Sequence, residues 1–202
     1  MFYRPGLDPH GLPHNPFKAI VSPRPIGWIS TLNAAGLPNL APYSFFNAVA
    51  DTPPMVLYSS TGAKNREKEG KDTVANIRAT GEFVVNIVSK ALRDAMNASS
   101  APLPHGVDEF EAVGLEKARC EVVAPPRVKA APASLECRMW KIIDLPGEAN
   151  TLVIGEVVGV HIDETLLRDG MLDVTLYQPL SRLGYRDYAA VTEVFALKRP
   201  AD

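Results

Sequence analysis

The sequence has 202 residues, of which 46% are hydrophobic and 22% charged, a composition typical of one folded globular domain and not of a disordered or fibrous chain. Its formal net charge of -2 provides no positive field for nucleic acid or anionic lipid, so neither is expected as a partner. No apolar run approaches the roughly 20 residues of a membrane span, and the N-terminus lacks a signal-peptide pattern. We therefore expect a cytoplasmic protein whose two cysteines, Cys120 and Cys137, are reduced thiols.

The first third of the chain passes from an irregular start into strand patterns. Residues 1–17 are rich in Pro, Gly and His and have no helix or strand period, which predicts an irregular N-terminal arm ahead of a domain over residues 18–202. Residues 26–32 and 39–46 are extended patterns separated by Asn and Gly turn residues, and together they predict a β-hairpin. Residues 55–60 predict a third strand.

The middle of the chain predicts helices and loops around one strand. An apolar helix pattern over residues 71–78 ends before Gly81, the residue type that usually closes a helix. Residues 82–88 predict a strand, and residues 90–98 predict a second short helix. Residues 99–132 have a high Pro, Gly and charged content and predict mostly loops.

Two long strand patterns over residues 134–145 and 151–162 predict a second hairpin. The chain thus has about six strands and two or three short helices, without the regular alternation of strand and helix that a doubly wound sheet requires. Tight turns favour antiparallel pairing. A small barrel is the simplest architecture, because closing the sheet removes exposed edges.

Common nucleotide and hydrolase motifs are absent. No G-x-G-x-x-G follows a predicted strand, so a Rossmann site has no support. The run GKDT at 70–73 lacks the upstream glycine of a phosphate-binding P-loop. No serine stands in a G-x-S-x-G elbow, which leaves nucleophilic hydrolysis unsupported.

The titratable side chains also give little sign of a site. The four histidines have no ligand spacing to either cysteine, so we expect no metal site and interpret each as a surface or loop residue; they are His10, His14, His105 and His161. The acidic residues Asp108, Glu109 and Glu111 fall in a charged loop and are interpreted as solvated surface.

Small and backbone-restricting residues gather around the first strands. Residues 22–31 combine two prolines with a glycine that permits close backbone approach, so a flat ring could lie against them. A proline-broken edge strand explains the same residues without a ligand. Residues 41–47 are likewise either a bulged strand with core aromatic residues or the edge of a cofactor site.

Four motifs in order resemble the flavin reductase-like, FMN-binding split-barrel family: RPIGWIST at 24–31, NLAPYSFFN at 39–47, KDT at 71–73 and TGEFVVN at 80–86. A weaker resemblance continues to LSRLG at 180–184. Members of the family often carry a second glycine after that segment, where this sequence has Tyr185. The sequence therefore leaves the backbone path open there.

The resemblance implies a mainly β fold, an antiparallel Greek-key split β-barrel with a few short helices, which pairs as a homodimer and binds one FMN per subunit near the dimer interface. The implied contacts of the flavin ring are Ile26, Gly27, Trp28, Ala41, Pro42, Tyr43, Ser44 and Phe45. The implied contacts of the phosphate are Ser30, Ser59, Ser60, Lys71 and Thr73, the last two at a helix start. Arg24, Ile29 and Asp72 complete the implied cofactor-binding set.

The resemblance further implies an NAD(P)H-dependent flavin reductase, which could supply reduced flavin to a partner oxygenase. No catalytic side chain is expected, because the cofactor carries the chemistry. Two alternatives remain open. One is an FMN-containing electron-transfer protein of flavoredoxin type, without direct use of NAD(P)H, and the other is a binding module on the same barrel without flavin.

Overall fold

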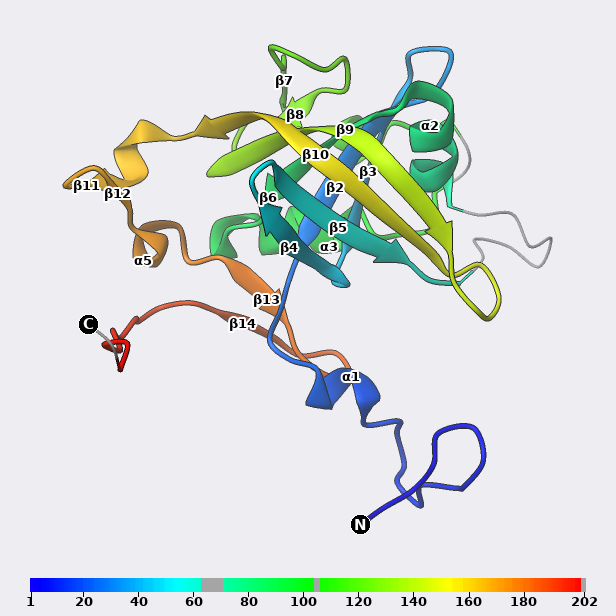
Figure 1. The fold of residues 1–202 in the computed structure, drawn as a ribbon. Helices are drawn as coiled ribbons and strands as arrows, with labels where there is room; N and C mark the ends of the chain where they lie inside the picture. Colours follow the sequence, from blue (N-terminus) through cyan, green and yellow to red (C-terminus); the bar gives the residue numbers. More distant parts are fainter. Residues whose placement is uncertain (63–70, 104–105, 201–202) are drawn as a thin grey trace.

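The computed structural model describes residues 1–62, 71–103 and 106–200. The described chain is mainly β with a few short helices (Figure 1), and every strand pair that it forms is antiparallel. This part of the predicted fold is confirmed. Within the described ranges, no helix combines the length and apolar character needed to cross a membrane.

Seven strands form the main sheet in the spatial order β3-β2-β6-β9-β10-β5-β4. In chain order they are β2 (Gly27–Leu32), β3 (Pro38–Tyr43), β4 (Phe46–Asp51), β5 (Pro54–Ser60), β6 (Glu82–Ile87), β9 (Ala133–Asp144) and β10 (Thr151–Ile162). Smaller sheets contain β1 (Arg24–Pro25) with β13 (Leu180–Arg182) and β14 (Tyr188–Ala190), β7 (Lys117–Ala118) with β8 (Arg127–Val128), and β11 (Leu167–Arg168) with β12 (Met171–Leu172).

The helices are short. They are α1 (Phe17–Ile20), α2 (Asp72–Thr80), α3 (Arg93–Ala98), α4 (Glu109–Ala112) and α5 (Val174–Tyr177), with single 3-10 turns η1 (Lys90–Leu92) and η2 (Glu164–Leu166). Helix α2 ends at Gly81 in a left-handed conformation with φ of 74°, which confirms the predicted helix end. Turn η1 and helix α3 together cover the second predicted helix.

The predicted first hairpin is confirmed by the antiparallel pairing of β2 with β3, but its second strand is shorter than the predicted residues 39–46. Strand β3 ends at Tyr43, and the chain crosses through Ser44 and Phe45 to the opposite edge of the sheet, where β4 begins. The backbone N–H of Ser59 donates to the carbonyl oxygen of Phe45 at 2.7 Å and holds the crossing against the end of β5. Within the described residues no ladder joins β3 to β4, so the Greek-key barrel stays a prediction.

Apolar side chains fill both faces of strand β2, which lies between β3 and β6. Ile29 packs with Ile77 of α2 in one buried cluster, and Trp28 packs with Phe110 of α4 in another. Alternate residues of a strand point to opposite faces, so this strand contributes to both clusters. The helices α2 and α4 therefore cover opposite faces of this part of the sheet.

Gly155 of β10 provides the space for the ring of Phe83. A Cβ added at Gly155 would lie 2.5 Å from Cζ of Phe83, whose side chain is fully buried. We expect Gly155→Ala to lower the free energy of unfolding by about 1–3 kcal/mol, because overpacking forces core side chains to shift. Urea denaturation measures this, with Phe83→Leu as the second arm of a double-mutant cycle. An equal cost of Gly155→Ala with and without Phe83→Leu would contradict the explanation.

Candidate functional site

A cavity of about 300 Å³ lies where α2 begins, and we call it the α2 cavity. It is bounded by β3, by the start of α2 and by the segment that follows α3. Its lining residues are Asn39, Ala41, Pro42, Tyr43, Lys71, Asp72, Thr73, Ser99, Ser100, Ala101, Pro102, Leu103 and Glu109. The structure thus brings together five residues of the implied ring and phosphate contacts, namely Ala41, Pro42, Tyr43, Lys71 and Thr73, along with Asp72 of the remaining set.

The start of α2 has the properties of an anion site. No side chain caps the helix, and uncapped N–H groups together with the helix dipole favour negative charge. The Thr73 side chain is almost fully buried and accepts a hydrogen bond from Nδ2 of Asn39 at 3.0 Å, which leaves its own hydroxyl proton to donate. Lys71 supplies a cation, and its Nζ lies 5.3 Å from the centre of the Tyr43 ring.

Burial, and to a smaller extent the nearby Lys18, lower the pKa of Lys71. Both effects disfavour the charged amine in the free protein. An anion beside Lys71 would favour the charged form and so offset both effects on the pKa. Two acidic residues, Asp72 and Glu109, line the same cavity. Lys71 is the only Lys or Arg among the described lining residues, which makes it the main electrostatic attraction for an anion there.

The hydroxyl of Tyr43 is buried and makes no well-formed hydrogen bond to the described residues. Burial raises the pKa of Tyr43 to about 12, although the nearby hydroxyls of Thr73 and Ser60 lower it in part. A buried polar atom without a partner is costly, and this one belongs to a residue that lines the α2 cavity. The hydroxyls and the helix start together fit a phosphate group, which has several acceptor oxygens.

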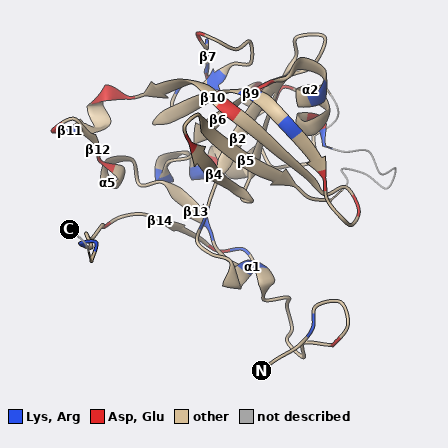
Figure 2. Cartoon of the chain, viewed as in Figure 1, with Lys and Arg blue, Asp and Glu red and all other residues tan. Residues whose placement is uncertain are grey.

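A second cavity, of about 730 Å³, lies beside Arg182 of β13, and we call it the β13 cavity. Its lining residues are His14, Asn15, Lys18, Arg24, Ser44, Arg182, Leu183, Tyr185, Arg186 and Asp187. Lys and Arg residues therefore gather at this corner, between α1 and β13 (Figure 2). Lys18 and Arg24 lie 5.8 and 5.7 Å from the centre of the Phe45 ring, so the crossing segment borders this cavity as well.

The guanidinium of Arg24 joins the N-terminal and C-terminal segments at this corner. It donates to the carbonyl oxygens of Lys18 and Val21 and, at 2.7 Å, to that of Leu183. Its Nε is buried and makes no hydrogen bond to the described residues. Burial and the neighbouring Arg182 lower the pKa of Arg24. Arg24 thus holds the N-terminal segment against the C-terminal one.

The residue that replaces the second family glycine adopts the conformation a glycine would favour. Tyr185 has φ of 54°, in the left-handed region. Its ring centre lies 5.7 Å from that of His14, which ties the N-terminal arm to this turn. A Cβ added at Gly184 would lie 2.4 Å from Cβ of Ala19, so the turn also packs closely on α1. Tyr185 therefore takes the backbone conformation of a glycine and adds an aromatic contact.

Other predicted contacts are buried in the core. Ile26, Trp28, Ile29 and Ser30 are all buried. Trp28 donates through Nε1 to Oγ of Ser99 at 2.9 Å, and Ser30 donates to the carbonyl oxygen of Pro126 at 2.5 Å. These partners explain both residues without a ligand, and contact of these four with a ring stays a prediction.

The last three predicted contacts lie around the crossing segment. A Cβ at Gly27 would lie 2.8 Å from the Phe46 ring, so this glycine serves close packing. Ser60 is buried near Tyr43, and Ser59 is half-buried on β5.

The interpretation of Glu109 as solvated surface was wrong. Glu109 is 8% exposed, and its Oε2 accepts the backbone N–H of Leu40 at 3.0 Å. Asp108 caps α4 by accepting the N–H of Phe110, while Glu111 is exposed as expected. Sequence reasoning also missed the lining contributed by residues 99–103, because nothing local indicates that this loop reaches β3.

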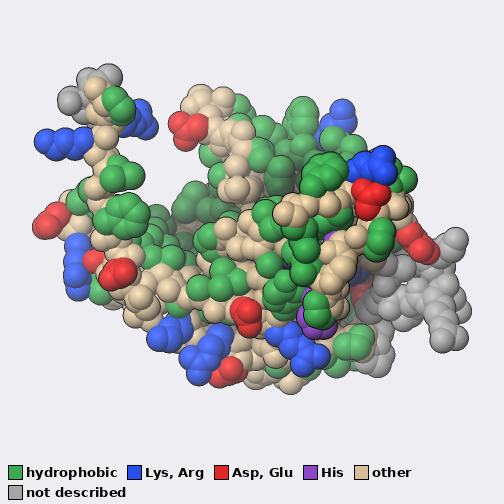
Figure 3. Space-filling model, turned by 90° about the horizontal axis from the view of Figure 1, so that it is seen from below, with side chains coloured by type: hydrophobic (Ala, Val, Ile, Leu, Met, Phe, Trp, Pro, Cys, Tyr) green, Lys and Arg blue, Asp and Glu red, His purple; other side chains and the backbone are tan. Residues whose placement is uncertain are grey.

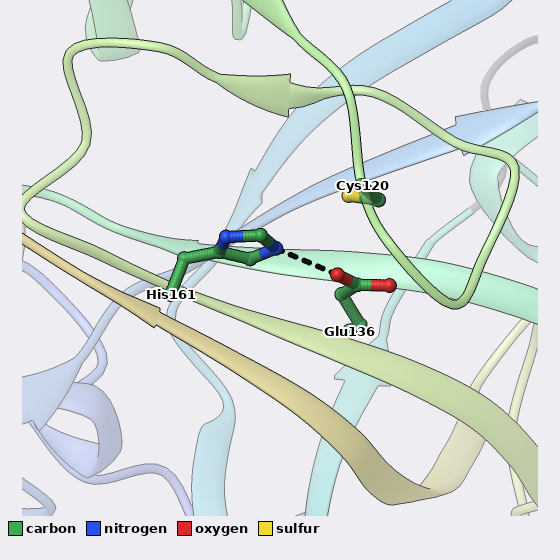
Figure 4. Close-up of side chains that lie close together, drawn as sticks. All are labelled: Cys120, Glu136 and His161. Atoms are coloured by element: carbon green, nitrogen blue, oxygen red, sulfur yellow. Dashed lines mark hydrogen bonds and ion pairs between the residues drawn. The ribbon is translucent and has the colours of Figure 1, made fainter.

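The interpretation of His161 as a surface or loop residue was also wrong. His161 lies on β10 and its Nε2 is 2.6 Å from Oε1 of the buried Glu136, close to Cys120 (Figure 4). Both cysteines are free thiols, as predicted, and both are buried. Burial and Glu136 raise the pKa of Cys120 to about 12, and burial likewise raises that of Cys137. His105 lies outside the described residues.

Comparison with known proteins assigns the family. A family model described as the flavin reductase like domain matches residues 21–181. The chain belongs to the flavin reductase-like domain family. Its resemblance to that family, first seen in four short motifs, is therefore confirmed.

Solved structures of similar proteins cover nearly all of this flavin reductase-like chain. Nitrilotriacetate monooxygenase component B from Bacillus cereus is 33% identical with a TM-score of 0.89, and the match covers 98% of each chain. The 2-nitrobenzoate 2-nitroreductase NbaA of Pseudomonas fluorescens is 32% identical with a TM-score of 0.79, over 91% of this chain and 88% of that one. Flavoredoxin of Desulfovibrio vulgaris is 26% identical with a TM-score of 0.78, over 90% and 93%. These relatives support a redox function that involves flavin.

Proposed function

We propose that this flavin reductase-like domain holds FMN with its phosphate in the α2 cavity. The observation that carries the proposal is the uncapped start of α2, where Lys71 and the buried Thr73 lie beside the hydroxyl of Tyr43, which makes no well-formed hydrogen bond to the described residues. N–H groups at the helix start, the Thr73 hydroxyl and the Lys71 ammonium would donate to phosphate oxygens. Together these groups would bind the phosphate dianion and partly neutralise it, although the chain as a whole carries no net positive charge.

The flavin ring would lie along the crossing segment, toward the β13 cavity. Tyr43 lines the α2 cavity and the next residue, Ser44, lines the β13 cavity. Lys18 also lines the β13 cavity and is close enough to Lys71 to lower its pKa, so the two cavities are neighbours. The basic side chains of Lys18, Arg24 and Arg182 would stabilise negative charge on a reduced ring.

The reaction we propose is that of an NAD(P)H-dependent flavin reductase. Bound FMN would supply the hydride-accepting chemistry, and the chain would orient the ring and exclude water. The similar Bacillus cereus protein is named as component B of a monooxygenase. That name supports a role in which reduced flavin passes to a partner oxygenase.

Anaerobic titration of the FMN-loaded protein with NADH and with NADPH tests the reaction. We expect one of the two nucleotides to bleach the flavin absorbance at stoichiometric amounts. Bleaching by dithionite but by neither nucleotide would contradict the reductase. Protein that gains no flavin absorbance after incubation with FMN would contradict the cofactor itself and favour a binding module without flavin.

An FMN-containing electron carrier is the second candidate, and the similarity to a flavoredoxin favours it. Such a carrier needs no nicotinamide site. In the same titration it would be reduced by ferredoxin or another protein donor but not by NADH or NADPH. Rapid reduction by a nicotinamide would contradict it.

We also propose that the chain forms a homodimer in the cytoplasm, a compartment that suits its two free thiols. Apolar side chains are exposed on both terminal segments, which extend away from the main sheet (Figure 1). Phe2 and Phe195 are 87% and 86% exposed, and further apolar side chains spread over the face shown in Figure 3. A second copy would cover such surface. Sedimentation equilibrium should give twice the mass of one chain, and a monomer at micromolar concentration would contradict the dimer.

A further inference from the structure

Three side chains with different metal-binding atoms converge on one face of the main sheet. Sγ of Cys120, a carboxylate oxygen of Glu136 and an imidazole nitrogen of His161 all lie within 4.8 Å of one another (Figure 4). The first two residues are buried and the third is partly exposed. None of the three lines the α2 cavity or the β13 cavity. The cluster is therefore separate from the proposed flavin site.

The pairing of β9 with β10 places two of these residues. Glu136 on β9 is opposite Gly159 on β10, and His161 lies two residues further along the same strand. Residues two apart on a strand point to the same face, so the imidazole of His161 is directed to the side of the sheet that carries Glu136. A Cβ at Gly159 would lie only 3.2 Å from Cδ of Glu136. The glycine leaves the room that the Glu136 side chain occupies.

The loop after Cys120 binds the same carboxylate. Oε1 of Glu136 accepts the backbone N–H of Glu121 at 2.8 Å, and Oε2 accepts those of Val122 and Val123 at 2.7 and 2.9 Å. These three bonds fix both the orientation of the carboxylate and the path of the loop. Cys120 directly precedes the loop, so its thiol is held beside the Glu136 carboxylate and His161.

We propose that Cys120, Glu136 and His161 bind a zinc ion. A thiolate, an imidazole and a carboxylate oxygen are the protein ligands that Zn²⁺ takes, and three of them leave a fourth position for water. The ion would be bound by Sγ, Oε1 and Nε2, with the N–H groups of the loop as the outer hydrogen bonds that orient the carboxylate. The side chain of His161 is 22% exposed, which gives the ion a path from solvent.

Binding replaces the hydrogen bond between Nε2 and Oε1 by two bonds to the metal. The imidazole proton moves from Nε2 to Nδ1, and the thiol of Cys120 releases its proton to solvent, so one proton leaves for each ion bound. The metal would tie the loop that follows Cys120 to β9 and β10. The bound ion would thus cross-link the segment between α4 and β9, in which β7 and β8 are the two regular elements.

The test uses the full-length protein, stripped with a chelator and titrated with ZnCl₂ against a competing indicator dye. We expect one Zn²⁺ per chain. Co²⁺ gives a second readout, since a tetrahedral site with a thiolate produces intense d–d bands at longer wavelength than flavin absorbs. Cys120→Ser and His161→Gln should each weaken Zn²⁺ binding at least about tenfold.

His161→Gln retains a hydrogen-bond donor for Glu136, so we expect this variant to fold. It therefore provides a test even if Cys120→Ser fails to fold. Cys137→Ala is the matched control. Cys137 belongs to a different buried cluster from Cys120, so this variant should bind Zn²⁺ as tightly as the wild type. Circular dichroism checks that each variant is folded. A wild-type chain that takes up no stoichiometric Zn²⁺, or folded His161→Gln that binds it as tightly as wild type, would overturn the proposal.

Discussion

Lys71→Met is expected to lower the affinity for FMN by about ten- to a hundredfold, the range that follows from losing one charge-assisted hydrogen bond of about 1.5–3 kcal/mol. Lys71 is the only Lys or Arg among the described residues that line the α2 cavity, and Asp72 and Glu109 add negative charge there. Without the ammonium, the phosphate would face two carboxylates with only N–H and hydroxyl donors to hold it.

Titration of the flavin-free protein with FMN measures this change in affinity, with the quenching of flavin fluorescence as the readout. Lys129→Met is the matched control. Lys129 is exposed and pairs with Glu116 at 2.5 Å, and it does not line the cavity. Equal FMN affinity in Lys71→Met and Lys129→Met would contradict the proposal that the FMN phosphate binds in the α2 cavity.

Glu136→Gln is expected to lower the free energy of unfolding by about 3 kcal/mol at neutral pH. Burial alone would raise the pKa of Glu136, but backbone N–H groups of the loop and the His161 side chain lower it to about 2, so the buried carboxylate is ionised. A glutamine amide has one acceptor oxygen and one donor nitrogen. Some of the loop N–H groups would then lose their acceptor and face a second donor.

Chemical denaturation in the presence of EDTA measures this cost without a contribution from bound metal. Glu121→Gln is the matched control, because Glu121 is an exposed acidic residue in the same loop, and its replacement should change stability by less than about 0.5 kcal/mol. If both variants are equally stable, the hydrogen bonds to Glu136 contribute little to folding.

Local patterns predicted the elements better than their arrangement. The apolar spacing of α2 and its closing Gly81 identified the helix from the sequence, and the long hairpin of β9 and β10 was found within one residue of its ends. Strand β4 was missed. Its residues are mostly exposed, with no apolar alternation. It forms a strand because the chain, after the crossing at Ser44 and Phe45, pairs with β5.

Residues brought together from distant parts of the chain account for the other errors. Glu109 looked solvated because its partner, the N–H of Leu40, is 69 positions away. His161 looked isolated because its contact with Glu136 depends on the pairing of β9 with β10 and on the irregularity of that pairing between Val157 and Gly159. Neither contact has a signature at fixed spacing, so neither was visible in the sequence.

The candidate site was predicted best where a local feature has a chemical meaning. Lys71 and Thr73 stand at the predicted start of a helix, and the structure places both on one cavity with Tyr43. The ring contacts were harder, because a strand with small and aromatic residues fits a core as well as a cofactor. Trp28 and Ile29 are fully buried, and their packing against Phe110 of α4 and Ile77 of α2 accounts for that without a ligand.

The affinities of the flavin-free protein for FMN and for riboflavin test the proposed FMN site most directly. The two ligands differ only in the phosphate, which we assign to Lys71, Thr73 and the start of α2. We predict that FMN binds at least about a hundredfold more tightly, equivalent to roughly 2.7 kcal/mol, and that most of this difference is lost in Lys71→Met. Equal affinities for FMN and riboflavin in the wild-type protein would contradict the proposed site.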